Sequence, residues 1–259
     1  MNYKTLDFIK HIETPLNWSD LILDQYAFTE VMKISSWLKE WCLNKKLNPG
    51  IRSLFYGRPG TGKTLTATLI SKSVGLDLYR VDLSMAISKY IGETEVNLKN
   101  IFDQAKKNKC ILFFDETDIL FESHSQINNS NNPHSNNVMA NLIQKCEEYA
   151  GPVVFSANLK PNPDSLFIQN VQSVIYFPIP DAAQRTLLWK NTFSHNAVLE
   201  DQVNIEEIAN KYELTGGSIF NIVRYASLMA IKRDHNTILL SDIIEGISRE
   251  FEKIGKPLS

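Results

Sequence analysis

One glycine-rich motif constrains the fold of this chain more than any other feature of the sequence. It is a complete G-x-x-x-x-G-K-T pattern, made of Gly57, Arg58, Pro59, Gly60, Thr61, Gly62, Lys63 and Thr64. An apolar, strand-like segment, Leu54–Tyr56, precedes it, and a segment with helical periodicity, Leu65–Val74, follows it. A strand, a glycine loop and a helix in this order predict a phosphate-binding loop rather than an ordinary glycine turn before a helix.

The residue types of this motif suit phosphate chemistry. Glycines let backbone N–H groups turn inward around phosphate oxygens, and the N-terminus of the following helix adds the positive end of its dipole. Lys63 can reach the β- and γ-phosphates, and the hydroxyl of Thr64 can ligate Mg²⁺. We therefore expect a nucleotide with a magnesium ion at this loop.

A pair of acidic residues follows a second apolar segment. Ile111–Phe114 predicts a buried parallel strand, and Asp115 and Glu116 come directly after it, 52 positions beyond Lys63 (115 − 63). Ligands of open α/β sheets bind beyond the carboxyl ends of the strands. We expect Asp115 to hold Mg²⁺ through water and Glu116 to polarise the attacking water, with a simple helix cap as the alternative.

An amide stands at the end of a third apolar segment. Asn158 follows Val153–Ala157 directly. An asparagine in this place can hold the attacking water near the γ-phosphate. Asparagine is also a frequent turn residue, so a purely structural role is a second interpretation.

Apolar and helix-periodic segments alternate along most of the chain. Segments with strand character are Ser53–Tyr56, Leu78–Val81, Cys110–Phe114, Val153–Ser156 and Val174–Phe177. Because helical patterns fill most of the intervals, we predict an α/β protein with βα units around a parallel sheet. Three regions are expected: a helical segment over 1–47 packed on the core, an α/β nucleotide-binding domain over 48–180, and a helical domain over 181–259, which Asp181 and Gln184 begin as an N-cap pair.

Composition excludes several classes of protein. The chain has 27 Lys plus Arg against 29 Asp plus Glu, a net charge of −2, and no basic cluster, so nucleic-acid binding is not expected. Its three cysteines form no CxxC pair, which favours free thiols in a reducing compartment. The sequence shows no N-terminal signal pattern and no apolar run of ~18 residues, so we expect a cytoplasmic protein without a membrane span.

One stretch of low complexity interrupts the pattern. Residues 128–137 contain six Asn, two Ser and one Pro. This composition offers almost nothing to bury and predicts an exposed, mobile loop.

Together, the motifs resemble those of a known family. The sequences GRPGTGKT over 57–64 and FFDE over 113–116, the strand before Asn158 and the C-terminal helical region are similar to those of AAA ATPases. Four further segments resemble the AAA ATPases that accompany contractile injection systems, the phage-tail-like particles: Tyr79–Ser84, Ser88–Glu95, Gln172–Pro178 and Tyr212–Ser218. The resemblance extends from about Trp18 to Phe251.

The resemblance implies a fold and a set of ligands. It implies a P-loop fold with a five-stranded parallel sheet in the order 5-1-4-3-2, followed by a small all-helical lid domain, with ATP bound between them. The implied nucleotide-binding residues are Gly57, Arg58, Pro59, Gly60, Thr61, Gly62, Lys63, Thr64, Leu65, Asp115 and Gly217. Thr64 and Asp115 would hold Mg²⁺, and Glu116 and Asn158 would be catalytic. A ring is also implied, usually of six subunits, formed with itself or with a related AAA subunit.

A polypeptide client is a further implication of the resemblance. In rings of this family an aromatic–aliphatic–glycine loop faces the pore and grips an extended polypeptide, and Tyr90, Ile91 and Gly92 match it, with Lys89 before them. An exposed aromatic ring beside a flexible glycine can pack on any side chain. A Tyr-Ile pair packed beneath a loop is the alternative.

One element of the family pattern is missing. Family members supply one or two arginines to the γ-phosphate of a neighbour from positions that align with Gln169 and Asn170, and no arginine occurs over residues 81–184. A trans-acting arginine is worth ~10³–10⁵ in rate in other phosphoryl-transfer systems, and neutral amides cannot replace its charge. Three explanations account for the missing arginine. The protein hydrolyses ATP slowly and acts as an assembly switch, a second ATPase supplies the arginine, or Lys160 or Arg58 replaces it.

Two functions from different classes follow. The first is an ATP-driven ring remodeller that engages a polypeptide through Tyr90. The second is a nucleotide-binding assembly or regulatory subunit with weak or no autonomous hydrolysis. Intact Lys63 and Glu116 favour the enzyme, whereas Gln169 and Asn170 favour the switch. A GTPase is not expected, because the N-K-x-D guanine signature is absent from the sequence.

Overall fold

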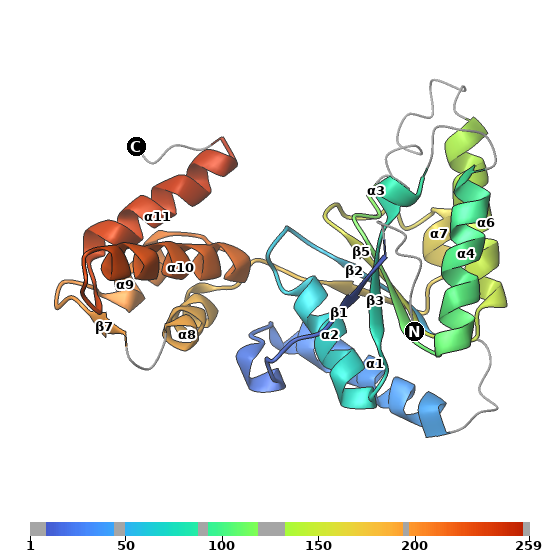
Figure 1. The fold of residues 1–259 in the computed structure, drawn as a ribbon, viewed down its shortest axis with the longest axis horizontal. Helices are drawn as coiled ribbons and strands as arrows, with labels where there is room; N and C mark the ends of the chain where they lie inside the picture. Colours follow the sequence, from blue (N-terminus) through green and yellow to red (C-terminus); the bar gives the residue numbers. More distant parts are fainter. Residues whose placement is uncertain (1–8, 44–49, 88–92, 119–132, 194–196, 256–259) are drawn as a thin grey trace. The chain divides into compact units, whose positions relative to one another are not determined.

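A computed structural model of the protein describes residues 9–43, 50–87, 93–118, 133–193 and 197–255. The chain divides into two compact units (Figure 1). The first comprises Met1–Trp18, Gln25–Gly57 and Lys63–Phe177, and the second comprises Ser19–Asp24, Arg58–Gly62 and Pro178–Ser259. Within the ranges described, no helix is both long and apolar enough to cross a membrane.

A six-stranded sheet forms the centre of the first unit. In spatial order its strands are β1 (Ile9–Ile12), β3 (Leu78–Asp82), β4 (Ile111–Asp115), β5 (Val153–Ala157), β2 (Arg52–Tyr56) and β6 (Ser173–Tyr176). The last five are parallel to one another, whereas β1 lies antiparallel to β3. Every residue of β5 is buried, as expected for a parallel strand covered by helices on both faces.

The sheet corrects the predicted five-stranded architecture. Numbered along the chain, the five parallel strands stand in the order 5-1-4-3-2 from β6 to β3, but β1 adds a sixth strand beyond β3, so the sheet is mixed rather than wholly parallel. The sequence of β1, IKHI, gives no strand signal, because its two central residues are both polar and both exposed. The region 1–47, predicted to be helical, thus contains a strand as well as helix α1 (Gln25–Leu43).

Helices cover both faces of this sheet (Figure 1). One face carries α1 and α2 (Lys63–Val74), and the other carries α4 (Glu93–Asn108), α6 (Pro133–Glu148) and α7 (Leu166–Gln169), while the short α3 (Leu83–Ala86) follows β3. Beneath α4, α6 and α7 lies a core whose aromatic side chains are Tyr79, Phe102, Phe114, Tyr149, Phe155 and Phe167. Because such cores are close-packed, the segments that leave β4 and β5 start from fixed positions.

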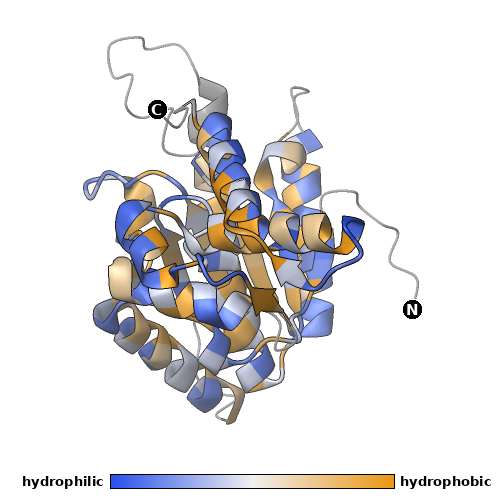
Figure 2. Cartoon of the chain, turned by 90° about the vertical axis from the view of Figure 1, so that its left-hand side faces the viewer, coloured by the Kyte–Doolittle hydropathy of each residue, from blue (hydrophilic) through white to orange (hydrophobic). Residues whose placement is uncertain are grey.

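The second unit is mainly helical. Helices α8 (Ala182–Thr192), α9 (Ile205–Lys211), α10 (Gly216–Lys232) and α11 (Leu240–Lys253) surround a core that includes the fully buried Trp189. Hydrophobic and hydrophilic residues alternate along the helices of the chain (Figure 2). In α11 the buried Ile243 and Ile247 are four positions apart, about one helical turn. Two short strands, β7 (Val198–Leu199) and β8 (Thr237–Ile238), pair in parallel, so the prediction of an all-helical region is corrected.

Two local predictions have opposite outcomes. The N-cap pair before α8 is confirmed: Asp181 accepts a hydrogen bond from the N–H of Gln184 at 2.8 Å, and the Gln184 side chain accepts one from the N–H of Asp181 at 2.9 Å. The predicted loop over 128–137 is corrected, because α6 begins at Pro133, while residues 128–132 lie outside the described part of the chain. Proline suits a first helical turn, since its fixed φ is helical and its missing N–H would have no helical partner there.

Candidate active site

The glycine motif forms the connection between β2 and α2. Gly57, directly after β2, has a φ of +148°, and a Cβ at this position would lie 2.1 Å from the carbonyl oxygen of Phe177. Its N–H donates to the carbonyl oxygen of Ala157 at 3.1 Å, which ties the start of the loop to the end of β5. Only glycine meets both the conformational and the steric requirement here.

The middle of the loop contacts the start of helix α10, and both segments belong to the second unit. The N–H of Gly217 donates to the carbonyl oxygen of Gly60 at 2.9 Å, and a Cβ on Gly217 would lie 2.9 Å from the Cα of Gly60. Thr215 caps the helix by accepting from the N–H of Ser218. The structure therefore places Gly217, a predicted nucleotide-binding residue, against the loop itself.

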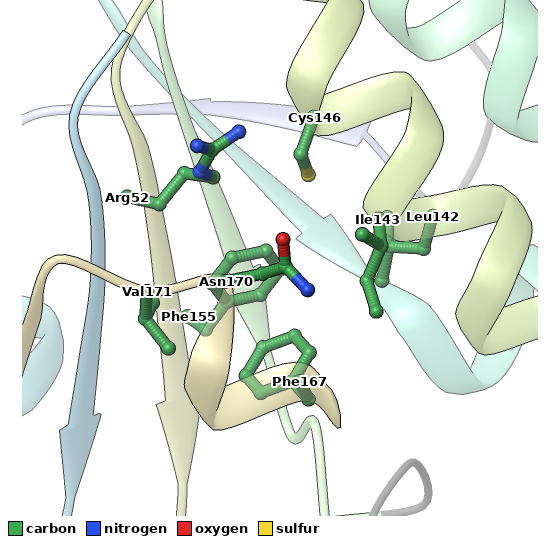
Figure 3. A pocket seen from close by; sticks show the side chains of 8 residues that line it. All are labelled: Arg52, Leu142, Ile143, Cys146, Phe155, Phe167, Asn170 and Val171. Atoms are coloured by element: carbon green, nitrogen blue, oxygen red, sulfur yellow. The ribbon is translucent and has the colours of Figure 1, made fainter. Parts of the chain in front are cut away.

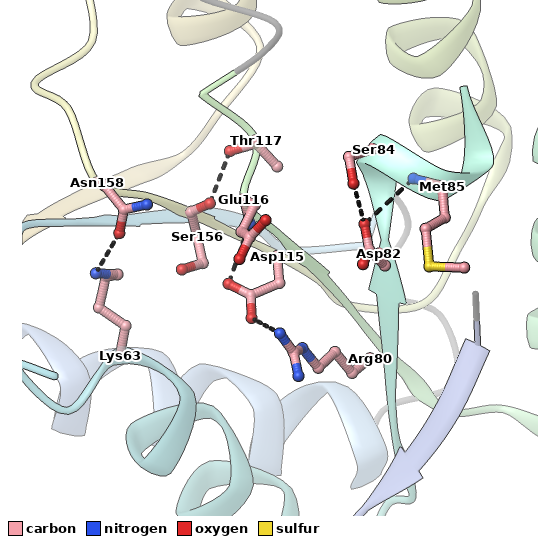
Figure 4. A network of polar contacts seen from close by, with 10 residues as sticks. All are labelled: Lys63, Arg80, Asp82, Ser84, Met85, Asp115, Glu116, Thr117, Ser156 and Asn158. Atoms are coloured by element: carbon pink, nitrogen blue, oxygen red, sulfur yellow. Dashed lines mark hydrogen bonds and ion pairs between the residues drawn. The ribbon is translucent and has the colours of Figure 1, made fainter. Parts of the chain in front are cut away.

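Lys63 begins α2 and lies almost fully buried, with 7% of its surface exposed. Its Nζ donates to the carbonyl oxygen of Gly57 at 2.5 Å. It also donates to Oδ1 of Asn158 at 3.3 Å (Figure 4). Burial lowers the pKa of Lys63, although Asp115 and Asp118 oppose the shift. Two residues predicted from separate motifs, Lys63 and Asn158, are thus brought into contact.

Asp115 and Glu116 lie at the carboxyl end of β4, next to β5 in the sheet. Oδ1 of Asp115 accepts from the N–H of Glu116 at 3.1 Å, and Oδ2 forms an ion pair with Nη2 of Arg80 at 2.8 Å (Figure 4). Glu116 is exposed and has a φ of +55°, in the left-handed region that a long side chain rarely adopts. Strain of this kind occurs preferentially at functional sites.

Two charged residues that organise the carboxyl ends of these strands were not predicted from the sequence. One is Arg80, described above. The other is Asp118, whose Oδ1 accepts from the N–H of Asn158 and of Leu159, each at 2.8 Å, while its Oδ2 accepts from the N–H of Asn158 at 2.9 Å. Asp118 therefore fixes the backbone that carries Asn158. The only sequence signal for it is its place two residues after Glu116, and nothing in the sequence singles out Arg80.

The positions aligned with the missing arginines lie at the opposite edge of the sheet, before β6. Gln169, the last residue of α7, is exposed. Asn170 lines a small cavity with Arg52, Cys146 and neighbouring apolar side chains (Figure 3). Arg52 is 9% exposed, and its Nε and Nη1 are buried without a hydrogen-bond partner in the described part of the chain.

The remaining predicted residues have the following places. Thr64 is exposed in the first turn of α2, Leu65 follows it, and Arg58, Pro59 and Thr61 belong to the loop. Lys89, Tyr90 and Ile91 lie outside the described residues, so the structure does not test the pore-loop prediction.

The residues present fit a nucleotide with a magnesium ion. Positive φ at Gly57, Gly60 and Gly62 shapes the loop, and it ends in the N-terminus of a helix twelve residues long, where the N–H groups of the first turn and the helix dipole favour an anion. A buried lysine supplies positive charge beside it. Thr64 and Asp115 supply the oxygen donors that Mg²⁺ prefers.

Similarity to known proteins identifies the family of this chain. The profile of the ATPase family associated with various cellular activities (AAA) matches residues 53–179. The chain is 30% identical over 233 residues to an uncharacterized AAA family ATPase of Sinorhizobium fredii, which covers 87% of this chain and 67% of that protein. It is 31% identical over 235 residues to the cell division cycle protein 48 homolog of Archaeoglobus fulgidus, covering 85% of this chain and 31% of that protein.

A third relative is cell division protein C of Sulfolobus acidocaldarius, 31% identical over 189 residues, with 69% of this chain and 50% of that protein covered. The chain thus spans half or less of the length of the two archaeal relatives. Its similarity to the Sinorhizobium fredii protein extends over two thirds of that protein. The chain therefore belongs to the AAA family of ATPases.

Proposed function

We propose that this chain binds ATP with Mg²⁺ and hydrolyses it as a subunit of a ring-forming remodeller. The observation that carries the proposal is the gathering of Lys63, Asn158 and the Asp115–Glu116 pair at the carboxyl ends of the neighbouring strands β2, β5 and β4. These are the residue types that phosphoryl transfer to water requires: a cation for the phosphates, a carboxylate for the metal, and a carboxylate and an amide for the water.

Each residue has one task in this proposal. The loop N–H groups and the Lys63 ammonium bind the phosphates, in exchange for the contacts that Lys63 makes with Gly57 and Asn158. Asp115 is one of the residues that would hold Mg²⁺, which would neutralise charge on the transferred phosphoryl group. Glu116 orients a water molecule and accepts its proton.

The variant Glu116→Gln tests the catalytic assignment. The amide keeps the shape of the side chain but cannot accept the proton, so we expect turnover to fall about 100-fold or more while ATP still binds. Equilibrium binding of a fluorescent ATP analogue and phosphate release measure the two quantities. Loss of ATP binding in this variant would show that Glu116 has another role.

Engagement of a polypeptide by Lys89, Tyr90 and Ile91 is the second part of the proposal, and the sequence pattern alone supports it. The ring contains six copies of this chain or alternates with a related AAA subunit. With unfolded casein as the probe, Tyr90→Ala should lose any stimulation of hydrolysis and keep the basal rate. Equal stimulation of the variant and the wild type would contradict this assignment.

A nucleotide-controlled assembly switch is the second candidate function. It is favoured by the neutral side chains of Gln169 and Asn170 and by the absence of arginine over residues 81–184. In this case ATP sets the oligomeric state, and the homomeric protein hydrolyses it slowly because no subunit supplies a cation to its neighbour. Phosphate release by the purified protein, together with its size with and without ATP, separates the two candidates. Several turnovers per second without a partner would overturn the switch.

The most specific part of the proposal is a role with a contractile injection system. It rests on the segments Tyr79–Ser84, Ser88–Glu95, Gln172–Pro178 and Tyr212–Ser218 alone. Neighbouring genes for sheath, tube and baseplate proteins would support it. A neighbouring gene for a second AAA protein would instead support a mixed ring.

A further inference from the structure

Both carboxylate oxygens of Asp115 contact other groups of this chain (Figure 4). Oδ2 pairs with Nη2 of Arg80 at 2.8 Å, and Oδ1 accepts from the N–H of Glu116 at 3.1 Å. The side chain of Asp115 is 14% exposed, and that of Arg80 is 41% exposed. A cation of this chain therefore already lies against the carboxylate that we expect to hold Mg²⁺.

Arg80 reaches this carboxylate from the neighbouring strand. In the register of β3 and β4, Arg80 lies opposite Phe113, and Asp82 lies opposite Asp115. The long arginine side chain spans this offset along the sheet, as Figure 4 shows. Its Nε is buried and has no hydrogen-bond partner in the described part of the chain. Asp82 of the same strand also attracts the guanidinium electrostatically. Among the described residues, the direct ion pair of Arg80 is the one with Asp115 at 2.8 Å, so the guanidinium can leave Asp115 while it stays near a second carboxylate.

The surrounding charges give this ion pair a consequence for ligand binding. Asp115 and Asp118 both act on the buried ammonium of Lys63, so two carboxylates, in addition to that of Glu116, belong to the site where we expect the phosphates. With Arg80 in place, the charge of Asp115 is compensated. Without it, Asp115 repels the phosphates of free ATP and attracts a divalent cation more strongly.

We propose that Arg80 is a positioning residue, which compensates and orients Asp115 until the hydrated Mg²⁺ of Mg·ATP displaces its guanidinium. This rests on the proposed function, because it assumes that the site binds Mg·ATP. Arginine and Mg²⁺ compete for the same oxygen, so the pair lowers the affinity for the metal and raises the affinity for metal-free ATP. An ion pair that served stability alone would produce neither effect.

The test measures ATP binding by the full-length protein in EDTA and over a magnesium titration, with a fluorescent ATP analogue as the probe. In Arg80→Met, we expect the Mg²⁺ concentration at half-maximal binding to fall on the order of fivefold, and the affinity in EDTA to fall by a similar factor. Arg80→Lys keeps the charge and should restore the affinity in EDTA. Arg249→Met is the matched control, since Arg249 pairs with Glu245 at 2.8 Å on α11; it should change neither quantity.

The outcomes separate this inference from the proposed function. If the wild type binds no ATP in either condition, the proposed function fails, and this inference fails with it. If the wild type binds ATP, two results for Arg80→Met overturn only the role of Arg80. The first is a change of the affinity for Mg²⁺ and of the affinity for ATP in EDTA in the same direction, and the second is no change in either affinity. Should Arg80→Met unfold, Arg80→Gln and Arg80→Lys carry the same comparison. In an Asp115→Asn background the Arg80 variants should lose the magnesium effect, because the shared carboxylate is gone.

Discussion

Charged side chains have different surroundings at the two ends of the strands of the central sheet, which we call the carboxyl edge and the amino edge. At the carboxyl edge, Lys63, Asp115 and Asp118 each contact a complementary group, and the hydrogen bonds run from one strand end to the next. At the amino edge, the guanidinium of Arg52 lies buried beside Asn170 with two donor atoms unpartnered in the described part of the chain. At the carboxyl ends of the strands, each charged side chain is paired with a group that a ligand could replace. At the amino ends, the guanidinium of Arg52 is buried, and two of its donor atoms have no acceptor among the described residues.

The largest expected effect concerns the cation at the carboxyl edge. Lys63→Met keeps the apolar stem and removes the ammonium, so we expect ATP affinity to fall about 100-fold, because a charged hydrogen bond to phosphate is worth about 1.5–3 kcal/mol. The control is Lys72→Met on the same helix, whose Nζ donates to the carbonyl oxygen of Leu16 at 2.8 Å. Titration with a fluorescent ATP analogue measures both. Equal losses in the two variants would mean that binding depends on net charge rather than on this site.

The next largest effect is a loss of turnover in Asp118→Ala, because Asp118 positions the backbone of Asn158. Asp118→Ala leaves two backbone N–H groups without their acceptor, which costs about 1–3 kcal/mol where they are buried and less where water replaces it. We expect a lower free energy of unfolding, by urea denaturation, and a turnover about tenfold lower, with ATP affinity nearly unchanged. Asp118→Asn should recover part of both, since its carbonyl oxygen still accepts. A loss of ATP affinity as large as in Lys63→Met would show that the main effect of Asp118 is its charge beside Lys63, and not its hold on the backbone of Asn158.

Residues fixed by local sequence were predictable at this edge. A strand that ends in an acid or an amide places that side chain at the carboxyl edge, so Asp115 and Asn158 follow from their segments alone. Arg80 could not be found in this way, because its contact depends on the register between β3 and β4. Asp118 is similar, since its partners are 40 and 41 positions away along the chain.

The fold shows the same limit. The parallel strands were located to within one residue at each end, because each contains an apolar run. Most residues of β2, β3, β4 and β5 are buried, as in strands covered on both faces, whereas in β6 the buried residue is Ile175. Strand β1 was missed, since an edge strand with exposed Lys10 and His11 has no such pattern and forms by pairing with β3. The strands β7 and β8 have two residues each, which is too short for any periodicity.

At the amino edge, the prediction is a gain in stability. Arg52→Met keeps the aliphatic stem against the cavity wall and removes a buried charge, so we expect the free energy of unfolding to rise by about 1 kcal/mol. Its backbone N–H still donates to Oε1 of Gln172 at 2.7 Å, which preserves the start of β2. Arg52→Lys keeps a buried charge and should give no gain. A loss of stability in Arg52→Met, measured by urea denaturation, would show that a partner compensates this guanidinium.

The smallest expected effect is on stability, and it arises from backbone strain rather than from a charge. Glu116 has a φ of +55°, and Lys109, exposed directly after α4, has a φ of +51°. Glycine adopts this conformation without strain but gains more entropy in the unfolded chain, so each change to glycine should stabilise the protein by about 0.5 kcal/mol.

Turnover separates these two positions. Lys109→Gly should keep the wild-type rate, whereas Glu116→Gly should lose it, because only Glu116 is expected to accept the proton of the water. If Glu116→Gly were less stable than Lys109→Gly, the Glu116 side chain would contribute to the folded state through its own contacts. Equal stabilisation with unequal turnover would instead mean that the chain keeps a strained glutamate at this edge for its chemistry, and that the strain lowers its stability.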